Sequence, residues 1–79
     1  MKTIAIVNPA AGSRRAPHVW PGLLSRLDAR ASQVVTWWTK GPGHAEFLAG
    51  QAKRAGVDRV IAVGGDGTIF EVANGLWWE

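Results

Sequence analysis

Three runs of apolar residues, rich in β-branched or aromatic side chains, recur along the chain, and glycine or proline follows each of them. They are TIAIV (3–7), QVVTWW (33–38) and RVIAV (59–63). Runs of this length and composition, bounded by turn residues, predict β-strands. Because the runs are apolar at nearly every position and not only at alternate ones, both faces of the predicted sheet are expected to be covered.

A helical pattern separates the second and third predicted strands. In the segment HAEFLAGQAKRAG, Ala45, Leu48, Ala52 and Ala55 occupy the i, i+3, i+7 and i+10 positions of one helix face. Gly56 follows and is a common residue at a helix C-terminus. This spacing predicts a helix that opens at His44 and packs its small residues against the sheet.

An earlier helix is predicted from about Pro21 to Ala31, with leucines 23, 24 and 27 forming its apolar stripe. Its start is poorly defined by the sequence, because Pro17 and Pro21 both interrupt the pattern. After the third strand, apolar residues 69, 72, 73 and 76 again show helical spacing, which predicts a third helix from near Thr68. Gly75 is expected to break or end that helix.

Strands that alternate with helices predict an α/β fold, because consecutive parallel strands need a long connection that crosses back over the sheet. We expect a three-stranded parallel, Rossmann-like sheet with flanking helices and strand order 2-1-3. A chain of 79 residues can form at most one small domain, and 47% hydrophobic with 19% charged residues is a globular composition.

Composition and charge exclude several classes of function. There is no cysteine, so disulfides and thiolate chemistry are absent, which fits a reducing, cytoplasmic environment. No apolar run approaches the roughly 20 residues of a membrane-spanning helix. The net charge of +3 suits anionic partners. Nucleic acid is not expected among them, because the tryptophans occur in pairs and do not alternate with basic residues.

Candidate chemistry begins where the third strand ends, in the stretch GGDGT. Gly64, Gly65 and Gly67 lie between a strand and a helix, where free backbone N–H groups and the positive end of a helix dipole form an anion site. The stretch is neither a Walker A loop nor a complete G-x-G-x-x-G motif, because Phe70 occupies the last position of the latter. We favour phosphate or nucleotide binding; the alternative is that the glycines only permit a tight turn.

Asp66 lies among these glycines. A carboxylate beside a bound phosphate would be repelled unless it holds a cation or accepts a proton during phosphoryl transfer. This makes Asp66 a candidate catalytic and metal-binding residue. The alternative is a structural role as a helix N-cap, for which aspartate is common.

The loops after all three strands contain glycine and polar residues: Asn8 to Gly12, Thr39 to Gly43 and Gly64 to Thr68. In an open parallel sheet the loops that follow the strands lie along one edge, and ligands bind where these loops meet. We therefore expect the three loops to converge on one binding site.

The segments NPAAG, TKGPGHA and GVDRVIAVGGDGTIFEVANGL together resemble the nucleotide-binding end of the diacylglycerol kinase catalytic domain, which sphingosine, ceramide and bacterial lipid kinases share. The resemblance covers essentially the whole chain. GGDGT followed by E-V-x-N-G-L is its specific part, because GGDGT alone also occurs in NAD kinases. Two positions depart from the pattern: bacterial members often carry Asn at Phe70, and serine is frequent at Ala11.

The resemblance implies an ATP-dependent kinase that uses Mg2+ and phosphorylates a lipid hydroxyl, on a diacylglycerol-like or a sphingoid lipid. Carried over by position, the ATP site would comprise Asn8, Pro9, Ala10, Ala11, Gly12, Thr39, Gly64, Gly65, Asp66, Gly67, Thr68, Ile69 and Phe70. Asp66 would lie near the transferred phosphate and the magnesium ion. Thr68 would offer its hydroxyl and its amide to a phosphate.

Residues 1–79 would then be the first part of a larger nucleotide-binding domain, with the family's second domain absent. Lipid would bind through that second domain, with peripheral contact to a membrane, and this chain would be inactive by itself. Two alternatives remain open: an NAD kinase-like fragment, and a non-catalytic nucleotide-binding or interaction module. Trp77 and Trp78, with nothing after them in the sequence to cover them, are expected to form a surface for a partner or for further protein.

Two other residues receive minor assignments. His44 is expected to have a structural role at the start of its helix. Glu71 receives no role.

Overall fold

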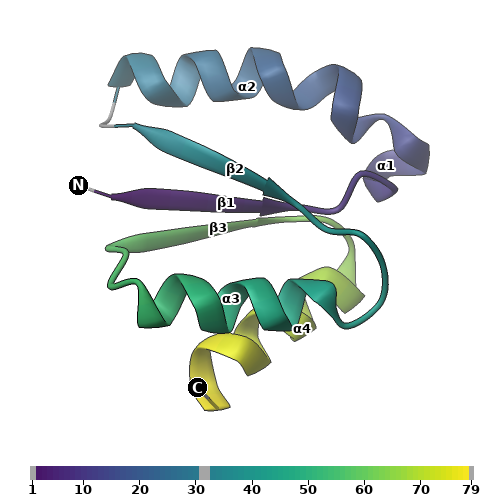
Figure 1. Cartoon of the computed structure of the whole chain (residues 1–79). Coiled ribbons are helices and arrows are strands. Elements are labelled where there is room, and N and C mark those ends of the chain that lie inside the picture. Colours follow the sequence, from purple (N-terminus) through teal and green to yellow (C-terminus); the bar gives the residue numbers. More distant parts are fainter. Residues whose placement is uncertain (1, 31–32, 79) are drawn as a thin grey trace.

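A three-stranded parallel sheet lies between helices on its two faces in the computed structural model, which describes residues 2–30 and 33–78 (Figure 1). The strands are β1 (Thr3–Val7), β2 (Val34–Trp38) and β3 (Arg59–Val63). Their order is β2-β1-β3, so that β1 is the central strand. The predicted fold class, strand order and strand positions are confirmed.

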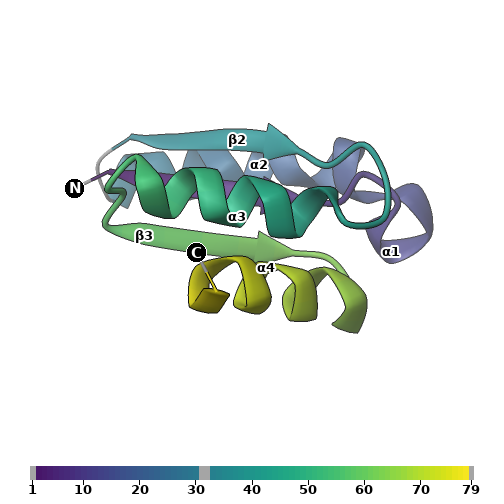
Figure 2. The same ribbon diagram turned by 60° about the horizontal axis from the view of Figure 1, so that its bottom comes forward.

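The alternation of side chains along β1 divides the core into two halves. Ile4 and Ile6 face α3 (His44–Arg54) and α4 (Asp66–Trp78), and Ala5 and Val7 face α2 (Ala16–Arg30). In Figure 2, α3 and α4 lie in front of the sheet and α2 lies behind it. Every residue of β1 is buried, as expected for a strand covered on both faces.

The start of α2 differs from the prediction. The helix begins at Ala16, five residues before the predicted start, and Pro21 lies inside it. Trp20 explains the extension: it is 4% exposed, and its indole N–H donates to the hydroxyl of Thr36 on β2 at 2.8 Å. This contact holds the first part of α2 on the sheet although prolines disfavour helix there. The end predicted at Ala31 lies outside the described residues.

The loop after β1 contains a short helical turn, α1 (Ala11–Arg14), which the sequence did not indicate. Gly12 and Ser13 have φ values of 61° and 58°, in the left-handed region. Helix α3 agrees with the prediction, and Gly56 follows it with φ 72°. No helix in ranges 2–30 and 33–78 is long and apolar enough to cross a bilayer.

The prediction that Gly75 breaks the last helix is wrong. Helix α4 begins at Asp66 and continues through Gly75 to Trp78. A Cβ atom at Gly75 would collide with the Glu46 carbonyl oxygen and lie 2.7 Å from the Cβ of Ala49. Glycine at this position therefore allows α4 to approach α3 closely, and this contact outweighs its low helix propensity. The Trp77 side chain is 79% exposed, and that of Trp78 lies outside the described part.

Candidate phosphate site at the carboxyl edge of the sheet

The three loops that follow the strands meet around a cavity of about 350 Å³. Its lining comes from the loop after β1 (Asn8, Ala10), the loop after β2 and the start of α3 (Thr39, Gly41, Pro42, Ala45), and the first turns of α4 (Gly67, Thr68, Glu71). The convergence predicted from the order of strands and loops is therefore present in the structure.

Asn8 fixes one wall of this cavity. Its amide nitrogen Nδ2 donates to the hydroxyl of Thr68 at 3.1 Å, and its Oδ1 accepts the N–H of Ala10 at 2.9 Å. The backbone N–H of Asn8 donates to the carbonyl of Val63 at 2.9 Å. One side chain thus ties the loop after β1 to the start of α4.

The loop after β2 forms the opposite wall. Thr39 is 7% exposed, and its N–H donates to the carbonyl of Val7 at 2.9 Å, which extends the sheet by one bond. The Nδ1 atom of His44 accepts the N–H of Lys40 at 2.9 Å, so His44 has the structural role predicted for it at the start of α3. The loop is therefore held at both of its ends.

Glu71 is a cavity residue that sequence reasoning left without a role. Its carboxylate accepts the N–H of Gly43 at 3.0 Å, which links α4 to the loop after β2. Gly43 has φ 83°, a conformation that favours glycine. A signal was present in the sequence, because Glu71 lies three residues after Thr68 and hence on the same side of the helix.

The three glycines of the GGDGT stretch differ in whether the fold requires glycine at their positions. A Cβ at Gly64 would collide with the hydroxyl of Thr68 and lie 2.5 Å from its Cβ. A Cβ at Gly65 or Gly67 would meet no atom within 4 Å, and neither residue has a positive φ. The tight turn thus accounts for Gly64, while the fold leaves open space at the other two glycines.

The first turn of α4 offers backbone donors at the same place. The N–H of Ile69 donates to the carbonyl of Gly65 at 3.1 Å, the first hydrogen bond of the helix. The amides of Asp66, Gly67 and Thr68 lie before Ile69 in the chain and so belong to the first turn. Amides in the first turn of a helix have no partner within the helix and carry its positive dipole end. The site therefore combines free donors with open space.

Asp66 is exposed at the first residue of α4. Within residues 2–30 and 33–78, its carboxylate makes no hydrogen bond or ion pair. The helix-cap alternative considered for Asp66 therefore finds no support in the structure, and the carboxylate is free to interact with a ligand.

The predicted site residues divide into three groups. Those that line the cavity are Asn8, Ala10, Thr39, Gly67 and Thr68. A separate hollow of about 250 Å³ is lined by Ala11, Gly12 and Gly64, among others. Pro9, Gly65, Asp66, Ile69 and Phe70 line neither, and the last two are 52% and 67% exposed.

The model of the diacylglycerol kinase catalytic domain matches residues 2–79 of this sequence. The chain belongs to this family. A Bacillus subtilis protein provisionally named as a lipid kinase, YtlR, is 42% identical over 74 residues, which are 90% of this chain and 24% of that protein. A diacylglycerol kinase of Staphylococcus epidermidis is 37% identical over 71 residues, or 90% of this chain and 22% of the relative.

Comparison of the fold with solved structures points to the same family. A crystal structure of a diacylglycerol kinase from Bacillus anthracis str. Sterne superposes with a TM-score of 0.82 at 34% identity. The superposition covers 94% of this chain and 27% of the other. The chain thus spans about a quarter of the length of the proteins it matches. These matches set aside the NAD kinase alternative, whereas they do not test the alternative of a non-catalytic module.

Proposed function

We propose that this chain forms the ATP-phosphate-binding part of a lipid kinase that transfers the γ-phosphate of ATP to a lipid hydroxyl, diacylglycerol-like or sphingoid. By itself the chain is proposed to bind ATP without transferring phosphate. The kinase would act from the cytoplasm with peripheral contact to a membrane, because its soluble and lipid substrates must meet there.

The observation that carries the proposal is the open space at Gly67. This glycine lines the cavity, and neither packing nor backbone conformation requires it. A missing Cβ beside free helix amides allows a phosphate to approach the backbone closely. Phosphate binding therefore explains a residue that the fold does not.

The proposed roles follow from position. The amides of Asp66, Gly67 and Thr68 would bind phosphate oxygens, and the hydroxyl of Thr68, already oriented by Asn8, would add a donor. Tight anion binding of this kind combines the dipole of the helix with several directed N–H groups.

Asp66 is the proposed catalytic carboxylate and the proposed magnesium ligand of this chain. The described residues contain no group of three or more metal ligands. Mg2+ in kinases is commonly held by one or two carboxylates together with substrate phosphates and water, and a single free aspartate fits that pattern. Bound there, the ion would neutralise charge on the transferred phosphoryl group.

The proposal is tested by calorimetric titration of the chain with ATP in the presence of Mg2+. Gly67→Ala is expected to weaken ATP binding by about tenfold or more, because the methyl group would occupy the space of the phosphate. Alanine is the better helix former, so folding should be retained.

The matched control is Gly22→Ala. Gly22 lies within α2, and a Cβ there also meets no atom within 4 Å. This variant should bind ATP like the unaltered chain. Equal ATP affinity in both variants would contradict the role of Gly67, and no ATP binding by the unaltered chain would favour the non-catalytic interaction module instead.

A further inference from the structure

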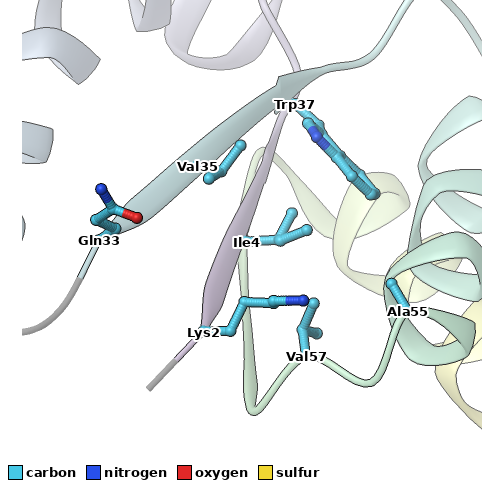
Figure 3. Close-up of a pocket in the computed structure, with 7 residues that line it drawn as sticks. All are labelled: Lys2, Ile4, Gln33, Val35, Trp37, Ala55 and Val57. Carbon is cyan, nitrogen blue, oxygen red and sulfur yellow. The ribbon is translucent and has the colours of Figure 1, made fainter.

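A second, larger cavity lies away from the phosphate site, between β2 and the end of α3. Its volume is about 600 Å³. Ile4, Val35, Trp37, Ala55 and Val57 form its apolar walls, and Lys2 and Gln33 are its polar residues. Figure 3 shows Ile4, Val35 and Trp37 projecting from the sheet toward α3, with Ala55 at the end of that helix.

The cavity exists because one face of β2 is incompletely covered. Ile4 pairs with Val35, and Ile6 pairs with Trp37, so these side chains share a face of the sheet. The helices on this face, α3 and α4, pack chiefly against β1 and β3. Val35 is therefore 47% exposed, which is unusual in a parallel sheet, where strands are generally covered on both faces.

The opposite face of β2 shows the contrast. Val34 is 8% exposed, and Thr36 accepts the hydrogen bond from Trp20 of α2. This face is well covered at Val34, whereas Trp38 at the end of the strand is 39% exposed. A further hollow of about 610 Å³ shares Trp37 with this cavity and is lined by Thr36, Trp38, Lys40 and His44, among others.

Charge restricts the ligand that would fit. Lys2 is the one ionisable residue among the cavity's lining, and no acidic residue of the described part contributes to it. The carboxylate of Asp58 accepts the backbone N–H of Lys2 at 2.6 Å, and Asp58 is not among the residues that line the cavity. An apolar wall with a cation at its edge complements a molecule with an apolar chain and an anionic head.

The volume also favours a small molecule. Ligand cavities in proteins typically measure about 300–1,000 Å³ and combine mostly apolar walls with a few polar groups that orient the ligand. We propose that this cavity binds a single-chain amphiphile with an anionic headgroup, of the long-chain fatty acid type. The chain of the ligand packs on Val35 and Trp37, and its headgroup lies at Lys2. The proposal is independent of ATP binding, which involves the other edge of the sheet.

The test uses the fluorescent fatty acid cis-parinarate, titrated into the chain below the concentration at which the probe self-associates. The unaltered chain should bind it saturably. Val35→Glu should weaken binding by about tenfold or more, because it places a carboxylate in the apolar wall. Val19→Glu is the matched control: Val19 is 51% exposed on α2, and the same substitution there should change affinity by less than about twofold.

A second comparison isolates the charge and does not depend on the folding of Val35→Glu. Lys2→Gln should weaken binding of cis-parinarate a few-fold and leave binding of its uncharged methyl ester unchanged. The proposal is overturned if binding is not saturable, if Val19→Glu weakens it as much as Val35→Glu, or if Lys2→Gln affects acid and ester alike. It is also overturned if sedimentation shows that the chain dimerises through the Val35 face and excludes the probe.

Discussion

Glycines in a single turn can be present for different physical reasons, and the stretch from Gly64 to Gly67 shows two of them. Gly64 is required by the protein itself, because Thr68 occupies the space of a side chain there. Gly65 and Gly67 face open space. The first glycine therefore contributes to stability, and the other two leave room for a ligand.

This division predicts different effects on stability for two neighbouring substitutions. Gly64→Ala should destabilise the chain by about 1–3 kcal/mol, because the new methyl group displaces the side chain of Thr68. Gly65→Ala should change the free energy of unfolding by less than about 0.5 kcal/mol. Thermal and urea unfolding followed by circular dichroism measures both; equal destabilisation of the two variants would contradict the assignment.

Asp66 lends itself to a charge-based prediction. Without Mg2+, Asp66→Asn should bind ATP a few-fold more tightly than the unaltered chain, because a carboxylate repels the triphosphate. With Mg2+ this advantage should be lost or reversed, since the carboxylate then helps to hold the ion. Titrations in EDTA and in Mg2+ compare the two states. If the substitution shifts ATP affinity by the same factor in both, Asp66 has no role in binding the metal.

At the scale of the elements, α4 connects the turn from Gly64 to Thr68 to the rest of the molecule. Gly75 brings the helix against α3, and Glu71 holds the loop after β2 through the N–H of Gly43. The Asn8 side chain makes the corresponding link to the loop after β1 through Thr68. The start of α4 is thus fixed to both neighbouring loops, which keeps the cavity at a defined width.

Removal of one link should loosen one loop selectively. Glu71→Ala should speed exchange of the Gly43 amide hydrogen by several-fold, consistent with a hydrogen bond worth about 0.5–1.5 kcal/mol. Glu71→Gln keeps an acceptor oxygen and should retain most of the protection. Exchange measured by NMR distinguishes them, with the amide of Ala10, bonded to Asn8, as an internal reference. Identical exchange of Gly43 in both variants would show that the contact does not restrain the loop.

The sequence predicted well the elements that local patterns determine, and less well those that depend on contacts between distant segments. Strands and α3 are determined by local patterns, and their predicted positions agree with the structure to within a residue or two at the ends. The start of α2 and the continuation of α4 depend on contacts between distant segments, Trp20 with Thr36 and Gly75 with Glu46. Local propensity favours a break at both places, so only the tertiary contacts reveal the helices.

For the whole molecule, the order of strands predicted the position of the candidate site, because a parallel sheet brings its loops to one edge. The side-chain contacts within the site could not be predicted in this way, and the link from Glu71 to Gly43 was missed for that reason. The hollow beside Lys2 was also missed, since it results from where two helices settle on a sheet and not from any motif.

The central claim is that the free amides at the start of α4 bind the phosphates of ATP. The most direct measurement is an NMR titration of the ¹⁵N-labelled chain with ATP and Mg2+. We expect the largest shifts at the amides of Asp66, Gly67 and Thr68, smaller ones at Gly43, and none at Gly22 in α2. Saturating ATP that leaves the first three amides unchanged, or that shifts another surface instead, would contradict the account.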